Sequence, residues 1–327
     1  MVSGRIILFA LLALAFVSTG HAEPRSLKST RFGGTSYVTI RDVADYYSLE
    51  RDQARSPERG EYRTSFAQLV IESERRSILL NGVTHWLTFP VVSARGQLWV
   101  SSIDVLKALD PVLRQGRSRE KAPVRTVVLD PGHGGNDTGA RGPQALEKVL
   151  TLDVAKRVQR QLEAAGLNVS LTRTRDTTLG LAERVMIAER RRADLLVSIH
   201  FNSGGSAEGI ETYCVPPAGA ASTAVSARNL FSHAADKTCA GNKFDERNVW
   251  LAHCVQRNLL KATGANDRGV RRARFVVIRD AKCPAILIEA GFLSNRSEEK
   301  RIRTPAYRDK LVEAITDGIL EYKKSVE

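Results

Sequence analysis

The chain has 327 residues, a formal net charge of +13 and only 6% aromatic residues. This length is enough for one large or two moderate domains with a substantial core. Few aromatic residues and no stacking motif exclude a typical nucleic-acid-binding domain despite the basic charge, so we expect no nucleic-acid partner.

The first 22 residues have the pattern of a secretory signal peptide. Arg5 supplies a positive charge, residues 6–17 are apolar, and residues 20–22 form a small-x-small cleavage pattern. The apolar run is shorter than the ~20 residues that cross a bilayer. No later stretch is apolar enough to span, and no cysteine follows the run to carry a lipid. We therefore predict an exported monomer that does not span a membrane and that resides in the periplasm or outside the cell. Its basic charge suits a polyanionic surface such as a cell-wall polymer, although an ordinary soluble surface explains the charge equally well.

Residues 29–113 have the pattern of a small α+β module. The Asn81-Gly82 pair is typical of a hairpin turn. Residues 41–47 and 102–109 are expected to be short helices, the second capped by serine. Short strands are expected over residues 37–40, 66–71, 77–80, 83–87 and 97–100. The stretch "LLNGVTHWLTFPVVSARGQLWVSSIDVLKALD" weakly resembles the N-terminal module found in copper amine oxidases and some wall enzymes.

Residues 114–123 are basic and lack apolar periodicity, which is typical of a linker. From residue 124 to residue 327, strand patterns alternate with helical ones. Strands are expected over residues 124–129, 169–172, 195–200, 209–214, 275–278 and 285–289, and helices over about 148–166, 181–192, 248–263 and 305–323. This alternation predicts an α/β fold with a sheet of mostly parallel strands flanked by helices, like that of phosphorylase- and hydrolase-type enzymes.

The stretch "VVLDPGHGGNDTGA", residues 127–140, is a buried strand that breaks into glycines around His133. A phosphate-cradling loop is one interpretation, but no G-x-G-x-x-G and no Lys-Ser/Thr pair are present. The alternative is that the glycines let the backbone bend sharply and leave His133 free to bind a metal.

Three predicted strands end in a residue suited to a metal site, namely His133, His200 and Glu289. In sheets of this kind, ligands bind beyond the carboxyl ends of the strands. Glu147 lies between the glycine loop and the first helix and offers a third ligand. The lone His85 of the N-terminal module is expected to be an ordinary surface or core histidine.

Two histidines and a glutamate with one open position are a common catalytic zinc set. Hydrolysis also needs a base that takes the proton of the attacking water, and Glu289 could serve. The sequence therefore predicts one zinc ion held by His133, Glu147 and His200.

Five motifs in order resemble the zinc-dependent N-acetylmuramoyl-L-alanine amidases. They are "LDPGHGGNDTGARG", "LEKVLTLDVAKRVQRQLEAAGLNVSLTRTRD", "LAERVMIAERRRADLLVSIHFNS", "GIETY" and "DRGVRRARFVVIRDAKCPAILIEAGFLSN". The resemblance implies that His133, Glu147 and His200 bind zinc and that Glu289 is the catalytic glutamate. It also implies a peptidoglycan substrate, cut between N-acetylmuramic acid and the L-alanine of the stem peptide. The module at residues 29–113 would then bind the wall or place the enzyme on it.

Two other functions remain open at this point. A zinc peptidase cutting within the stem peptide would use the same metal chemistry. A catalytically silent relative could bind wall peptides as an adaptor, although all four chemical residues are present.

The four cysteines, Cys214, Cys239, Cys254 and Cys283, form no C-x-x-C pair. Disulfides or buried free thiols are therefore favoured over a structural zinc site.

Residues 215–248 form a longer segment than the resembled family usually has. They follow a strand that comes after His200, so we expect the segment to leave the sheet near the metal site. A short helix is expected over residues 224–235. The segment is either a substrate-groove wall pinned by Cys239 or a lid on which an activator protein acts. In the second case Asp236, Asp245 or Glu246 would cap the metal.

Overall fold

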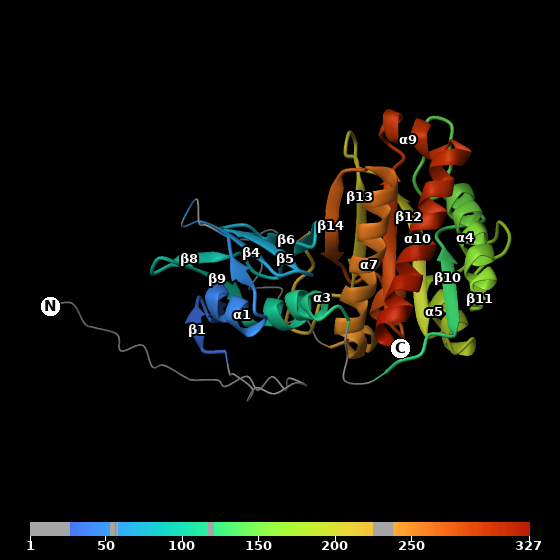
Figure 1. Ribbon diagram of the computed structural model, residues 1–327. Helices are drawn as coiled ribbons and strands as arrows, with labels where there is room; N and C mark the ends of the chain where they lie inside the picture. The colour runs from blue at the N-terminus through green and yellow to red at the C-terminus, as the bar shows by residue number, and fades with distance from the viewer. Residues whose placement is uncertain (1–26, 53–55, 57, 117–120, 225–237) are drawn as a thin grey trace.

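The computed structural model describes residues 27–327 except 53–55, 57, 117–120 and 225–237 (Figure 1). The predicted signal peptide lies outside the described residues. No helix among the described residues combines the length and the hydropathy that crossing a bilayer requires.

The N-terminal module, residues 29–113, is built from short strands and helices as expected. Asn81 and Gly82 have φ values of 49° and 77°, which confirms the predicted hairpin turn between two strands. The Ser101 side chain accepts a hydrogen bond from the Asp104 amide and caps the second helix, also as predicted. The strands are β1 (Ser29–Phe32), β2 (Thr35–Thr39), β3 (Glu50–Arg51), β4 (Arg59–Arg63), β5 (Gln68–Glu72), β6 (Ser77–Leu80), β7 (Val83–Trp86), β8 (Val92–Ala94) and β9 (Gln97–Ser101). The helices are α1 (Ile40–Tyr46), α2 (Ser102–Asp104), a π-helical turn (Val105–Leu109) and α3 (Asp110–Leu113).

The C-terminal part, residues 124–327, is a mixed sheet flanked by helices, which confirms the predicted fold class. Strands β11, β10, β12 and β15 are parallel, β13 is antiparallel to β15, and β14 is parallel to β13. The strands in spatial order are β11 (Asn168–Leu171), β10 (Thr126–Pro131), β12 (Leu195–Asn202), β15 (Ala285–Phe292), β13 (Ile210–Cys214) and β14 (Asp267–Arg272).

Helices cover the two faces of this sheet unequally. One face is covered by the long helices α4 (Glu147–Ala164), α7 (Asp245–Thr263) and α10 (Pro305–Val326) (Figure 1). The opposite face is covered by α5 (Leu181–Arg190) and the single turn α8 (Val276–Arg279). α9 (Arg296–Ile302) follows β15.

Side chains alternate between the two faces along each strand. Val197 and Ile199 of β12 belong to the large core under the long helices, whereas Leu196 packs with the smaller cluster under α5 and α8. That smaller cluster involves only the first half of β12 and β15, through residues such as Leu196 and Leu287. The second half of the same face carries polar side chains instead, including His200 and Glu289. We call this half the groove face.

One predicted strand was wrong and one strand was missed. The run expected as a strand at residues 275–278 is the helical turn α8, in which the amides of Arg279 and Asp280 donate to the carbonyls of Phe275 and Val276. Four apolar residues are too few to distinguish a strand from a helical turn by periodicity. The strand β14 was missed because its sequence, DRGVRR, is charged and contains a glycine.

The prediction that residues 215–248 leave the sheet near His200 was wrong. Because β13 is antiparallel to β15, Glu211 pairs with Glu289 and the chain leaves β13 at the opposite edge of the sheet. Asn248 marks that edge, where its side chain accepts from the amide of Ala285, the first residue of β15.

Two of the three carboxylates proposed as metal caps, Asp245 and Glu246, do not lie at the metal site. Asp245 and Glu246 lie near the Lys107 ammonium, at 3.7 and 3.8 Å, and line a cavity of about 350 Å³ between α3 and α7. Asp236, most of the predicted helix at residues 224–235 and His233 lie outside the described residues.

All four cysteines lie in the described part of the chain and are free thiols. Cys214, Cys254 and Cys283 are buried, and Cys239 is half-buried. Of the two possibilities favoured from the sequence, free thiols are therefore the one observed.

The two parts of the chain share one sheet. β7 pairs in parallel with β14 through His85 and Val270, so the sheet runs on into β6, β5, β4 and β3. On the long-helix side of this junction, His85 Nε2 lies 2.9 Å from Nδ1 of His253 on α7, and both rings are buried. His85 is thus a core histidine, one of the two possibilities expected for it.

Candidate metal centre

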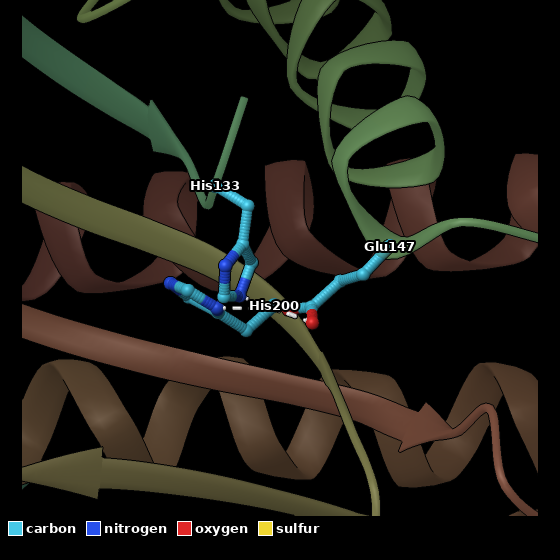
Figure 2. Close-up of side chains that lie close together, drawn as sticks. All are labelled: His133, Glu147 and His200. Atoms are coloured by element: carbon cyan, nitrogen blue, oxygen red, sulfur yellow. Dashed lines mark hydrogen bonds and ion pairs between the residues drawn. The ribbon is translucent and has the colours of Figure 1, made fainter. Parts of the chain in front are cut away.

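Three side chains from separate elements converge at the carboxyl end of the sheet (Figure 2). His133 comes from the loop after β10, Glu147 begins α4, and His200 lies on β12. The Glu147 carboxylate lies 3.0 Å from His133 Nε2 and 2.9 Å from His200 Nδ1. One nitrogen or oxygen of each residue lies within 4.8 Å of those of the other two. The structure thus brings together the three residues that the sequence predicted as ligands, and we call them the metal triad.

The glycines around His133 are needed because the triad leaves no room for side chains. A Cβ atom at Gly132 would lie 2.2 Å from His200 Cε1, and one at Gly139 would lie 2.4 Å from a Glu147 carboxylate oxygen. His133 itself has a φ of 60°, a conformation that non-glycine residues rarely adopt. The backbone is therefore strained at His133, in the conformation in which the imidazole faces Glu147.

Asp137 orients the His133 ring. Its carboxylate lies 2.8 Å from His133 Nδ1, which leaves Nε2 directed at the rest of the triad. A carboxylate that accepts from the second ring nitrogen is a common partner of metal-binding histidines, because it fixes the tautomer and the ring orientation.

Two buried arginines hold the glycine loop. Arg173 donates to the carbonyl oxygens of Pro131 and Gly132, and Arg184 donates to the carbonyl oxygens of Pro131 and His133. Arg184 also forms a buried ion pair with Asp130 at 2.7 Å. Burial alone would raise the pKa of Asp130, but Arg184 and nearby hydroxyl donors lower it below its usual value. The loop is thus fixed by charge-assisted hydrogen bonds as well as by its own turns.

Hydrogen bonds orient the Glu147 carboxylate and keep it ionised. Its two oxygens accept from the amides of Ala140 and Phe201, at 2.6 and 3.0 Å. Burial would raise the pKa of Glu147, but the hydrogen bonds from His133 and His200 outweigh it and lower the pKa to about 2. For His133, burial would lower the pKa, and its bonds to Glu147 and Asp137 raise it instead.

Glu289 lies beside the triad on the groove face. Its Cα is paired in register with that of His200 across β12 and β15. Its Oε2 atom is buried and has no hydrogen-bond partner among the described residues. Burial, together with the charges of Glu147 and Glu211, raises the pKa of Glu289 well above its usual value. The structure therefore places a carboxyl group, whose buried Oε2 atom finds no partner in the described part of the chain, next to the three candidate ligands.

The donor set and its spacing fit a zinc ion. Zinc is bound by histidine nitrogen and carboxylate oxygen at ~2.0–2.2 Å, so two ligand atoms of a tetrahedral site lie about 3.3 Å apart. One Glu147 oxygen lies 3.0 Å from His133 Nε2 and the other lies 2.9 Å from His200 Nδ1. One ligand atom from each of the three residues lies within 4.8 Å of the other two, so the three side chains are close enough to share one ion. Three protein ligands leave a fourth position for water or substrate, as in catalytic sites.

The sequence did not single out the residues that surround the triad. Asp137 lies in the quoted glycine loop, four positions after His133, a spacing that draws attention only once His133 is taken as a ligand. Arg173 follows β11 and Arg184 lies in the first turn of α5, and no local pattern distinguishes them from surface arginines. Glu211 is 2% exposed and accepts from Asn202, Tyr213, Arg268 and Arg271. It was predicted only as part of a strand.

Relatives of known name match most of the chain. LytC of Bacillus subtilis is 34% identical over 260 residues, which cover 78% of this chain and 47% of LytC. AmiA of Escherichia coli is 31% identical over 287 residues, which cover 79% of this chain and 95% of AmiA. Both relatives are named N-acetylmuramoyl-L-alanine amidases. The chain thus spans about half the length of the first relative and nearly all of the second.

Solved structures match the C-terminal part. The catalytic domain of CwlV, an N-acetylmuramoyl-L-alanine amidase from Bacillus (Paenibacillus) polymyxa, has 35% identity and a TM-score of 0.50, and covers 62% of this chain and 99% of that one. The CwlD amidase from Clostridioides difficile, solved in complex with the GerS lipoprotein, has 27% identity and a TM-score of 0.51, and covers 61% of this chain and 98% of that one.

The family described as N-acetylmuramoyl-L-alanine amidase matches residues 127–321. This range contains the metal triad, Glu289 and every strand of the C-terminal sheet except the first residue of β10. The chain belongs to the N-acetylmuramoyl-L-alanine amidase family, and residues 127–321 are its amidase domain.

Proposed function

We propose that this protein is a zinc-dependent hydrolase of peptidoglycan that cuts the amide between the lactyl group of N-acetylmuramic acid and L-alanine. The observation that carries the proposal is the convergence of His133, Glu147 and His200 beside Glu289, whose buried Oε2 atom has no partner among the described residues. Which amide bond is cut is inferred from membership of the N-acetylmuramoyl-L-alanine amidase family.

The chain's own residues hold the metal and handle the proton. His133, Glu147 and His200 would bind zinc, with Asp137 fixing the ring of the first ligand. Bound zinc would supply Lewis-acid chemistry, which acidifies water and polarises a carbonyl oxygen. Glu289 would accept a proton from the attacking water and deliver it to the leaving nitrogen of L-alanine. In the overall reaction a carbon–oxygen bond forms, the carbon–nitrogen bond breaks, and the stem peptide leaves with a free amino group.

Two alternatives share parts of this arrangement. A zinc peptidase acting within the stem would use the same groups on a different amide, and a silent adaptor would bind the wall without cutting it. Family membership favours the amidase over both, since the matching relatives are named amidases.

Digestion of purified sacculi separates the three functions. Mass spectrometry of the products should show intact glycan strands and released peptides that begin with L-alanine. Peptides cut at an internal bond would identify a peptidase, and undigested sacculi with zinc bound to the protein would identify an adaptor.

We also propose that the protein is exported, that residues 1–22 are its signal peptide, and that it acts as a monomer in the periplasm or the cell wall. The N-terminal pattern of charge and apolar residues supports export, and so does a substrate that lies outside the cytoplasm. The N-terminal module, joined through residues 114–123 to an amidase domain over residues 124–327, would help to place the enzyme on the wall. Fractionation of cells that carry the full chain tests the location, and N-terminal sequencing of the mature protein tests cleavage after Ala22.

A partner protein could regulate this enzyme. CwlD, a similar protein, was solved in complex with the GerS lipoprotein. We propose that a protein partner of this chain acts on residues 215–248, which leave the sheet at the edge opposite the metal triad. Excision of residues 218–243 should then abolish stimulation by that partner and leave basal activity in place. Stimulation that persists after excision would contradict a role of this segment in partner binding.

A further inference from the structure

The N-terminal module reaches the groove face through β7. The Thr84 amide donates to the Asp267 carboxylate at 2.7 Å, and Trp86 Nε1 donates to the Arg268 carbonyl at 2.9 Å. Gly269 lets the two backbones approach, because a Cβ atom there would lie 2.5 Å from the Thr84 carbonyl oxygen. The side chain of Trp86 is therefore fixed beside β14 of the amidase domain.

Strand alternation places the Trp86 ring on the side of the sheet that carries Glu211 and Glu289. His85 points to the long-helix side, where it meets His253, so the next residue along β7 points to the opposite side. The Arg271 guanidinium lies 4.5 Å from the centroid of the Trp86 ring and 6.0 Å from that of Tyr213. Both distances are within the range of cation–π attraction.

Two arginines on this face share one buried carboxylate. Arg268 Nε and Arg271 Nη1 donate to the same oxygen of Glu211, at 2.9 and 2.8 Å. Two guanidinium groups against one carboxylate leave a positive charge in excess. The Arg268 side chain is 32% exposed and the Arg271 side chain 15%, so both are partly open to solvent and can meet a ligand on this face. We call Arg268 and Arg271 the arginine pair.

The arginine pair lies within a few peptide residues of the reacting bond. Glu211 is paired in register with Glu289, and β14 is the next strand beyond β13. Adjacent strands are ~4.7–4.9 Å apart, so β14 lies about 10 Å from the Glu289 backbone. An extended peptide advances ~3.3–3.6 Å per residue, so a group two or three residues beyond the cut amide reaches the arginine pair.

We infer that the arginine pair, with Trp86 of the N-terminal module as its support, binds a free carboxylate of the stem peptide two or three residues beyond the bond that is cut. The inference rests on the proposed amidase function. A guanidinium suits this task because it recognises a carboxylate with paired hydrogen bonds and stacks on an aromatic ring. The N-terminal module would thus take part in substrate selection as well as in placement.

The test compares soluble N-acetylmuramoyl tripeptides that differ only in a carboxylate. One substrate has free carboxylates on the second and third residues, and two others carry an amide at one of these positions. With the zinc-loaded full chain, Arg271→Met should raise KM for the free-carboxylate substrate about 10- to 100-fold, since a charged hydrogen bond is lost. For the substrate in which the bound carboxylate is already an amide, the substitution should raise KM much less. The substrate that shows this smaller rise identifies the position that is bound. Values of kcat should change little.

Three further variants sharpen the result. Arg271→Lys should recover part of the affinity and guards against a folding defect in the methionine variant. Trp86→Leu should raise KM a few-fold for the free-carboxylate substrate only, because the cation–π support is lost. Arg160→Met is the matched control, since Arg160 is exposed on α4, which covers the other face of the sheet.

An equal loss on all three substrates, or a fall in kcat at constant KM, would overturn the inference and leave the arginine pair as a support for Glu211. Absence of any hydrolysis by the unaltered protein would instead refute the proposed function. In that case calorimetric binding of the free-carboxylate and amidated tripeptides still decides the subsite, because binding needs no turnover. Equal affinities for the carboxylate and amide forms would again overturn it.

Discussion

Acidification should destabilise the junction between β7 and α7 through the buried pair His85 and His253. Burial, the proximity of His253 and the charge of Arg272 hold the pKa of His85 well below its usual value. Burial and, to a smaller extent, Arg257 lower the pKa of His253 to about 3. Both imidazoles are therefore neutral in the folded protein at pH 5.5, whereas in the unfolded chain they gain protons near pH 6.5.

The sign and size of the effect follow from proton linkage. Because the unfolded chain binds protons that the folded protein does not, stability falls as the pH decreases from about 7.5 through 6.5 toward the folded-state pKa. At pH 5.5 the loss is roughly 1–1.5 kcal/mol per imidazole and roughly 2–3 kcal/mol for the pair. This is a large share of the ~5–15 kcal/mol by which a domain is usually stable.

The assay is urea unfolding of metal-free protein at pH 7.5 and pH 5.5, with the double variant His85→Leu/His253→Leu as the comparison. Replacing both polar partners by apolar groups need not destabilise the core strongly. The raised pKa of His133 acts in the opposite direction, but it contributes equally to both proteins and cancels in the difference. The unaltered protein should lose roughly 2–3 kcal/mol more than the double variant between the two pH values. An equal loss in both proteins would refute the reasoning.

Four other predictions concern the metal site and its support. Asp137→Ala should weaken zinc binding about 10- to 100-fold in a competition titration with a chelator, because His133 loses the partner that fixes its ring; unchanged affinity would show that the loop alone positions the imidazole. His200→Ala should abolish stoichiometric zinc binding in metal analysis, and full occupancy would remove His200 from the ligand set. Glu289→Gln should retain zinc while hydrolysis falls about 10²–10⁴-fold in a rate assay, and near-normal rates would assign proton transfer to another group. Arg184→Met should lower the free energy of unfolding by about 3–5 kcal/mol because Asp130 is left buried without its ion-pair partner; a loss below about 1 kcal/mol in urea unfolding would contradict this role.

The candidate site could be anticipated because it follows from topology. His133, His200 and Glu289 come directly after or at the end of apolar strand patterns, and parallel strands bring their carboxyl ends to one edge of a sheet. Glu147 was identifiable only by its place between the glycine loop and a helix. The strands and helices that carry these residues have strong apolar periodicity, which is the signal that sequence patterns report best.

The remaining features depend on contacts between distant segments. Apolar periodicity does not indicate the direction of a strand. The antiparallel direction of β13 is known only from the pairing of Glu211 with Glu289, and it is this direction that takes residues 215–248 to the far edge of the sheet. β14 is charged because Arg268 and Arg271 face Glu211, and a strand that carries arginines and a glycine has no apolar pattern. No local sequence pattern predicts the pairing of β7 with β14.

The central claim is that the metal triad and Glu289 together cut the lactyl–alanine amide, and a zinc titration of metal-free protein tests it most directly. Zinc is added stepwise while the release of L-alanine amino groups from an N-acetylmuramoyl peptide is measured. Activity should rise linearly and level off at about one zinc per chain, and Glu289→Gln should bind the same amount of zinc without releasing product. Full activity before zinc is added, or products cut within the stem peptide, would contradict the account.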